Sequence, residues 1–183
     1  MNRKEFLQNC ACTLCTCAAA GMIAPAVAAA DDKKSPEDWR FPFIKNRYAK
    51  LMNILADQMD EKALSEVLRQ LGYHCASQYP LIQQHKGDIA GFIRDFEARS
   101  GEKITYDSGN GLVTVVSPAR VDCYCPLVDR DRAPKIICNC SLGWQQYTDE
   151  VLLGKKVQVE LKESVVRGGQ RCIFQIHVLD QAV

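Results

Sequence analysis

Two Cys-x-Cys pairs are the residues of this chain whose type and spacing most directly indicate chemistry. They are Cys123 with Cys125 and Cys138 with Cys140, and twelve residues separate the two pairs. Four thiolates that converge on one point satisfy a tetrahedral ion, most simply Zn²⁺ with sulfur ligands at about 2.3 Å. The polar, turn-prone segment between the pairs can fold back to join them. The spacing therefore predicts a metal site with zinc as the favoured cofactor, and an iron–sulfur cluster or no cofactor as alternatives.

The same four thiols admit two other interpretations. Oxidising compartments favour disulfides, and a bridge between the pairs, such as Cys123 to Cys138, is geometrically feasible, whereas a bridge within one pair is strained. Free thiols are the third interpretation. Cys138 and Cys140 are expected to precede a helix that Ser141 caps, and the dipole of this helix would favour thiolate over thiol.

Two further cysteines, Cys75 and Cys172, are interpreted first as buried hydrophobic residues, since free cysteine is often buried. Cys172 falls on the apolar face of an expected strand, beside Phe174. Cys75 follows His74 just after an expected helix end, where it could complete or line a site. A bond between Cys75 and Cys172 also remains open.

Residues 1–30 have the character of an export signal. Arg3 and Lys4 give a positive start, residues 11–30 are uncharged and mostly small or apolar, and three alanines precede Asp31 as a cleavage site. The run over residues 2–7 resembles a twin-arginine motif with lysine as its second basic residue. We expect a periplasmic or otherwise exported protein that meets the membrane only through this signal.

Four more cysteines lie inside this expected signal. The simplest interpretation is that they are small apolar residues of a segment that is removed. They are Cys10, Cys12, Cys15 and Cys17.

Length and composition limit the number of domains and the classes of partner. The chain has 183 residues, 47% of them apolar and 25% charged, which is typical of one globular domain. Its 23 basic and 22 acidic residues form no basic stripe, which argues against a nucleic acid partner. We divide it into the signal, a leader over residues 31–43 and a cysteine-rich α+β domain over residues 44–183.

The elements of this domain follow from hydrophobic periodicity. Apolar residues at spacings of three and four predict helices over about 44–59, 61–71, 88–99 and 141–153, the second of which Gly72 should end. Short β-branched runs joined by a glycine-rich turn predict a hairpin of 103–107 with 112–116, and alternation of apolar and polar residues predicts a second hairpin of 157–161 with 172–178. The predicted fold is a single α+β domain with N-terminal helices packed on an antiparallel sheet of about four strands.

The C-terminal run over residues 153–176 resembles the ending of vinyl-reductase-type domains, with a strand, a small-residue turn containing glycine, and Cys172-Ile-Phe in the last strand. Together with the Cys125-Pro126 step, it is also similar to the L-2-amino-thiazoline-4-carboxylic acid hydrolase family. The resemblance covers about residues 60–180. It implies an α+β module that binds small molecules or hydrocarbons and whose clustered cysteines hold metal. Cys172 carries over as a structural position, and the metal-binding positions are Cys123, Cys125, Cys138 and Cys140.

These observations favour an exported, non-catalytic domain that holds a metal and binds a small apolar molecule between sheet and helices. Four apolar residues would line that pocket: Leu68, Phe92, Phe96 and Trp144. One alternative is a hydrolase of a cyclic C–N bond, of the thiazoline carboxylate type, in which a cysteine or metal-bound water is the working group. Another is a disulfide-stapled structural domain. No catalytic residue is assigned, and whether the chain is an enzyme stays open.

Overall fold

The computed structural model describes residues 39–182, with side chains as far as Leu179. The expected signal and residues 31–38 of the expected leader lie outside this part of the chain. The helices are α2 (Arg40–Gln58), α3 (Glu61–Ser77), α4 (Pro80–Gln84), α5 (Ile89–Ser100) and α6 (Cys138–Leu153), with short 3-10 turns η1 (Lys135–Ile137) and η2 (Val165–Arg167). The strands are β1 (Lys103–Asp107), β2 (Leu112–Val116), β3 (Lys155–Glu163) and β4 (Ile173–Ala182).

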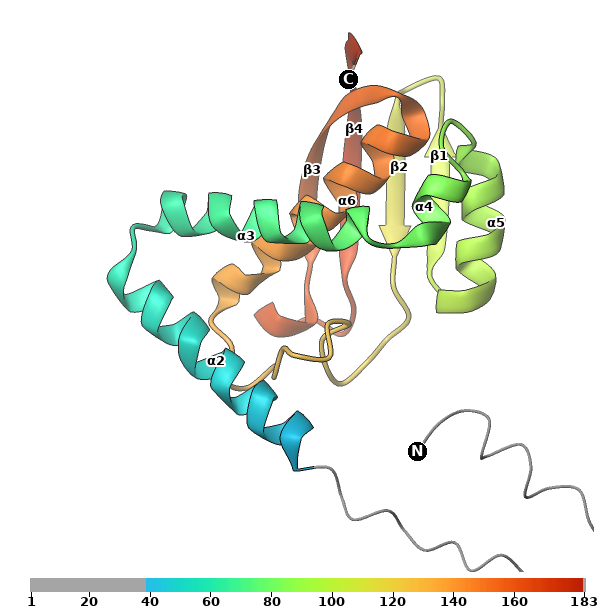
Figure 1. Ribbon diagram of the computed structural model, residues 1–183. Helices are drawn as coiled ribbons and strands as arrows, with labels where there is room; N and C mark the ends of the chain where they lie inside the picture. Colours follow the sequence, from blue (N-terminus) through green and yellow to red (C-terminus); the bar gives the residue numbers. More distant parts are fainter. Residues whose placement is uncertain (1–38, 183) are drawn as a thin grey trace, which may run out of the picture. The chain divides into compact units, whose positions relative to one another are not determined.

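One four-stranded antiparallel sheet, in the order β1-β2-β4-β3, forms the base of the domain. Residues that alternate along its strands, such as Val113 on β2 and Ile176 on β4, point inward and are almost fully buried. Leu142 of α6 packs against this apolar face. Figure 1 shows α6 lying along the sheet and α3 crossing α6. The predicted α+β class, the single domain and the antiparallel sheet are therefore confirmed.

The crossing of α3 and α6 depends on two glycines. A Cβ at Gly72 of α3 would lie 1.7 Å from the carbonyl oxygen of Cys140, and a Cβ at Gly143 of α6 would lie 1.9 Å from that of Arg69. Any side chain at either position would collide with backbone, so the two helices touch main chain to main chain. Gly72 therefore does not end the second helix as predicted, because α3 continues through it to Ser77.

Two helix starts also differ from the sequence prediction. α6 begins at Cys138 rather than at Ser141, because η1 already coils the chain into the helix. The two cysteines therefore belong to the first turn of α6 instead of preceding it. α2 begins at Arg40, so residues 40–43 of the predicted leader are helical.

The predicted apolar pocket is filled by its own lining residues. Phe92 and Phe96 stack with ring centroids 5.0 Å apart. Trp144 joins the same core cluster, whereas Leu68 belongs to a different one. These four residues are core, and they line neither of the two cavities described below.

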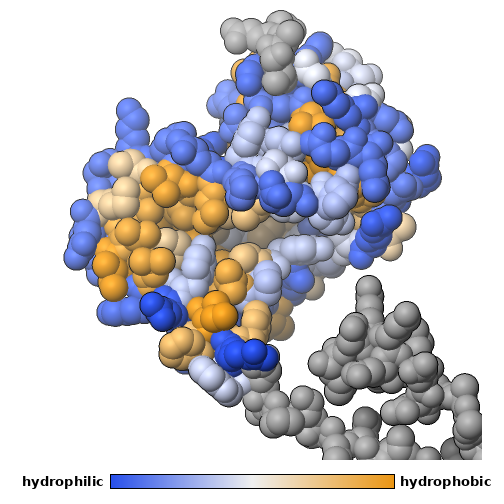
Figure 2. Space-filling view, in the orientation of Figure 1, coloured by the Kyte–Doolittle hydropathy of each residue, from blue (hydrophilic) through white to orange (hydrophobic). Residues whose placement is uncertain are grey.

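Apolar side chains also reach the surface where α2 and α3 meet. Figure 2 shows this orange area of the molecule. Its exposed members include Leu51 and Ile54 of α2 and Val67 and Leu71 of α3. Within residues 39–182, no helix combines the length and apolar character needed to cross a membrane.

Candidate functional site

All four cysteines of the predicted metal site line one small cavity of about 40 Å³. Cys172 lines it as a fifth cysteine, and Tyr48 of α2 closes part of its wall. The remaining wall is mostly apolar and comprises Val128, Ile137, Ser141, Leu161, Ser164, Val166 and Phe174. The chain thus brings together cysteines from the segment before η1, from α6 and from the residue just before β4.

Polar contacts with α2 hold the segment that carries Cys123 and Cys125. Lys45 Nζ lies 2.9 Å from Asp122 Oδ2. Asn53 Nδ2 donates a hydrogen bond of 2.8 Å to the carbonyl oxygen of Arg132. These contacts bracket the segment from both ends, so α2 fixes it over the cavity.

The carboxylate of Asp122 organises the residues next to Cys123. Its Oδ1 accepts hydrogen bonds from the backbone N–H of Cys123 at 2.9 Å and of Arg130 at 3.2 Å. The hydrogen bond from Lys45, together with these backbone donors, lowers the pKa of Asp122. Asp122 therefore remains a charged anchor at neutral pH.

The position of Cys138 and Cys140 in α6 sends their side chains in different directions. Residues two apart on a helix are separated by about 200° around its axis and do not face one another. Cys138 is buried, and its Sγ shares a hydrogen bond of 3.1 Å with Ser164 Oγ. Cys140 is half-buried and interacts electrostatically with Cys75. Both cysteines nevertheless line the one small cavity.

The thiols differ in their exposure and their neighbours. Cys138 and Cys172 interact electrostatically with each other and with Cys123. Cys125 is exposed, and Cys75 is exposed and lies outside the cavity lining. All six cysteines of the described part are free thiols rather than disulfides.

Tyr48 lies in the wall of the cavity beside several of the thiols. Desolvation by burial, followed by the neighbouring thiols, raises its pKa to about 12. The thiols that act on it are Cys140, Cys125, Cys75 and Cys123.

Burial also governs the protonation of the thiols. Desolvation, with a smaller contribution from neighbouring thiols, raises the pKa of Cys123 to about 11 and that of Cys140 to about 12. The expectation that the dipole of α6 would favour the thiolate is therefore wrong for Cys140, because desolvation outweighs it. Cys123 and Cys140 are therefore neutral thiols at pH 7, and a bound cation would displace their protons.

The residues present suit a thiophilic metal by donor type and location. Soft thiolate sulfur favours zinc, Cu(I) and iron–sulfur clusters, and 40 Å³ is room for an ion rather than for an organic ligand. Among residues 39–179, no group of three or more Cys, His, Asp or Glu side chains already stands in metal-holding geometry. Binding would therefore require rotation of the thiol side chains.

Sequence reasoning placed Cys172 in the core and named Cys75 only as a residue that could complete or line a site; the cavity lining includes Cys172 but not Cys75. Cys172 was expected in the core, and the structure places it beside Cys138 at the end of the cavity. The thiols with which Cys172 interacts, those of Cys138 and Cys123, lie 34 or more residues earlier in the chain, so no local spacing of cysteines reveals the contact. For Cys75 the only available signal was the odd position of a cysteine near a helix end.

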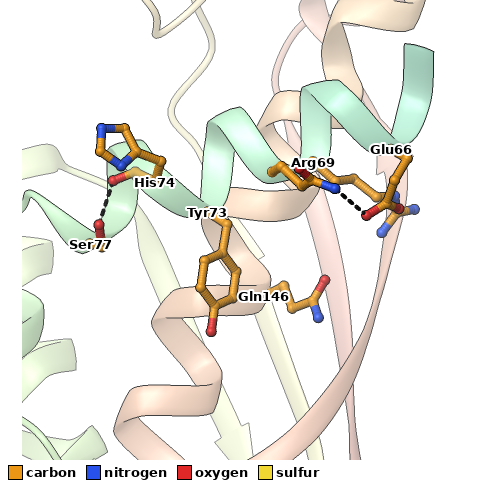
Figure 3. A pocket seen from close by; sticks show the side chains of 7 residues that line it. Glu66, Arg69, Tyr73, His74, Ser77 and Gln146 are labelled. Carbon is orange, nitrogen blue, oxygen red and sulfur yellow. Dashed lines mark hydrogen bonds between the residues drawn. The ribbon is translucent and has the colours of Figure 1, made fainter. Parts of the chain in front are cut away.

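A second, larger hollow of about 560 Å³ lies open on the surface between α3 and α6. Figure 3 shows Tyr73 and His74 of α3 on its wall, with Gln146 of α6 beneath. Its polar groups bond largely to their own helix; for example, Ser77 Oγ donates to the carbonyl oxygen of His74 at 2.7 Å. The lining of this polar hollow contains no cysteine, unlike that of the thiol cavity.

Comparison with solved structures places the fold. The phenol-responsive sensory domain of the transcription activator PoxR, solved with phenol, superposes with a TM-score of 0.52 at 15% identity, over 75% of each chain. A vinyl-4-reductase family protein from Methanocaldococcus jannaschii gives a TM-score of 0.37 at 12% identity, over 82% of this chain and 85% of that one. The chain has a distant, fold-level similarity to the vinyl-reductase-type domain.

A trafficking protein particle complex subunit 3 from Naegleria fowleri, covalently bound to palmitic acid, gives a TM-score of 0.49 at 16% identity, over 80% of this chain and 99% of that one. No protein-family model matches the sequence, and no curated protein matches it. At these identities the structural matches concern the fold alone.

Proposed function

We propose that this chain is an exported metal-binding domain whose thiol cavity holds a zinc-class ion. The observation that carries the proposal is the convergence of Cys123, Cys125, Cys138 and Cys140 on one small cavity. When bound, the ion would supply a structural cross-link between the loop, α6 and the sheet. Export rests on the signal-like composition of residues 1–30.

The size of the cavity supports an ion over an apolar ligand. Cavities for small organic molecules usually measure about 300–1,000 Å³, whereas this one measures about 40 Å³. A cysteine nucleophile needs a lowered pKa or a neighbouring base that takes its proton. Burial instead raises the pKa of Cys123 and Cys140, so these thiols are not activated for nucleophilic attack. A non-catalytic role follows as part of the proposal.

Metal analysis tests the proposal directly. The reduced full chain would be produced with Cys10, Cys12, Cys15 and Cys17 all replaced by serine, so that only the folded domain supplies thiols. After incubation with zinc and gel filtration, we expect at least one zinc per chain by mass spectrometry. Cys123→Ser and Cys138→Ser should each lower zinc below a tenth of an equivalent. Cys75→Ser, a matched substitution outside the cavity lining, should retain at least one zinc.

Binding of a small apolar molecule is the second candidate function. It is favoured by the fold shared with the PoxR sensory domain, which was solved with phenol. A thermal-shift series with phenol on the zinc-loaded chain would measure it. A melting temperature that does not move at millimolar phenol would leave metal binding as the whole of the proposed function.

A further inference from the structure

One side of α2 is apolar and faces solvent. Only two of the 19 residues of this helix, Ala49 and Met52, are buried. Four large apolar side chains on its other side stay between 38% and 51% exposed, and they are Phe43, Ile44, Leu51 and Ile54. Figure 1 shows α2 at the edge of the domain, away from the sheet. Within the described part of the chain, no element covers this side of α2, so it is open to a partner.

Helical spacing places two cations among these apolar side chains. Positions 43, 47, 50 and 54 follow one another at intervals of three and four, and so do positions 44, 47, 51 and 54. Arg47 and Lys50 are both exposed. We call these two cations and the four apolar residues the outer face of α2.

The opposite side of α2 holds the helix against the domain. Positions 45, 49 and 52 are spaced by four and three, and Ala49 and Met52 are buried there. On the same side, Lys45 Nζ lies 2.9 Å from Asp122 Oδ2. These contacts fix the rotation of α2, so the outer face remains directed toward solvent.

The charge of α2 is of one sign over most of its length. Residues 39–56 include four basic residues and no acidic one. Within residues 39–179, no acidic side chain pairs with Arg47 or Lys50. A surface that is both apolar and cationic complements a bilayer with anionic headgroups. A second copy of the chain is a poorer match, because two such faces would place like charges against each other.

Two features at the start of α2 agree with a membrane as the partner. Trp39, which precedes the first turn, is 69% exposed, and tryptophan is enriched where one end of the ring is apolar and the other is wet. The uncharged segment of residues 11–30 ends nine residues before Arg40. Nine residues span at most about 30 Å, so a membrane that takes up this segment would be within reach of α2.

We propose that the outer face of α2 binds the surface of an anionic lipid bilayer, with the helix in the plane of the headgroups. The four apolar side chains enter the boundary between headgroups and acyl chains, and Arg47 and Lys50 extend to the lipid phosphates. This contact belongs to the folded domain and is additional to the one expected of residues 1–30. Tyr48, through which α2 lines the thiol cavity, is not part of the outer face.

Flotation of the full chain with vesicles of phosphatidylcholine and phosphatidylglycerol tests the proposal. The double variant Arg47→Gln, Lys50→Gln should bind these vesicles about 30-fold more weakly, which corresponds to about 1 kcal/mol for each cation. The matched control Lys86→Gln, Arg99→Gln removes two exposed cations beside α5, on the other side of the domain from α2 (Figure 1). It should change binding less than about threefold, because distant charges are screened by salt.

A fluorescence measurement separates binding by α2 from binding by residues 1–30. In a chain that carries Trp39→Phe and Ile54→Trp, the introduced indole lies at the end of the outer face farthest from those residues. Brominated lipid should quench its fluorescence when anionic vesicles are bound. The remaining Trp144 packs in the core and should not be quenched.

Each outcome bears on the proposal. Equal binding by the unsubstituted chain and by Arg47→Gln, Lys50→Gln, or no quenching at position 54, would overturn it. A gel-filtration mass of two chains that Leu51→Ser reduces to one, without vesicle binding, would overturn it in favour of a second copy. An unchanged melting temperature verifies that the variants fold. None of the substituted residues lines the thiol cavity, so vesicle binding and zinc binding can fail independently.

Discussion

Asp149 offers a quantitative test of how burial acts on this domain. The residue lies in α6, is only 3% exposed, and its Oδ2 has no hydrogen-bond partner within the described residues. Desolvation by burial raises its pKa from 3.8 to about 7. The folded protein therefore keeps this carboxyl group protonated in a range where the unfolded chain has already ionised it.

The sign of the effect follows from proton linkage. Between about pH 4 and pH 7, the unfolded state binds fewer protons at Asp149 than the folded state, so stability falls as the pH rises. A difference of about three pKa units corresponds to at most about 4 kcal/mol, at 1.36 kcal/mol per unit. The penalty is absent near pH 4 and complete above pH 7.

The substitution Asp149→Asn removes this titration while nearly preserving shape. Relative to the unsubstituted protein, we expect the variant to gain up to about 4 kcal/mol between pH 4 and pH 8, measured by urea unfolding at fixed metal content. Asp57→Asn, an exposed change on α2, is the matched control and should not reproduce this gain. A pH-independent difference for Asp149→Asn, or one of opposite sign, would refute the burial argument.

Three further predictions concern the helix crossing and the thiol cavity. Gly72→Ala should destabilise the protein by about 2–4 kcal/mol in urea unfolding, since its Cβ would collide with the Cys140 carbonyl, whereas Gly109→Ala, which meets ordinary contacts, should change it little. In the metal-free protein, iodoacetamide should modify Cys140 about 1,000-fold more slowly at pH 8 than a thiol of pKa 9, because its pKa is about 12. That rate should rise about tenfold per pH unit to pH 11, and a plateau below pH 10 would contradict the raised pKa. Asp122→Ala, which removes two backbone hydrogen bonds beside Cys123, should cost about 1–3 kcal/mol locally and speed hydrogen exchange over residues 121–130; unchanged exchange there would show that Asp122 is not the anchor.

Local sequence patterns predicted most of the fold. Strict alternation over residues 157–161 predicted a strand, because the sheet has one buried face, and the β-branched residues of 112–116 predicted another. The periodic apolar face of residues 61–71 predicted a helix. Local pattern could not show which element packs against a given residue, and Gly72 is an example. Glycine within a helix looks like an end until the backbone of another helix lies against it.

The same distinction applies to the site. The close spacing of the paired cysteines was visible in the sequence, and all four do line one cavity. The place of Cys138 and Cys140 inside the first turn of α6 was not visible, because local pattern put the helix start at Ser141. Cys172 joins the other four cavity cysteines only through tertiary structure, from the position just before β4. Whether these thiols hold zinc remains a prediction.

Where α3 and α6 cross at Gly72 and Gly143, contact between main-chain atoms sets the distance between these two cysteine-bearing helices. Replacement of a cysteine by histidine or aspartate on either helix would thus alter the donor and leave the scaffold's dimensions unchanged. The domain is in this sense a fixed frame into which a different coordination chemistry could be engineered by exchanging single side chains.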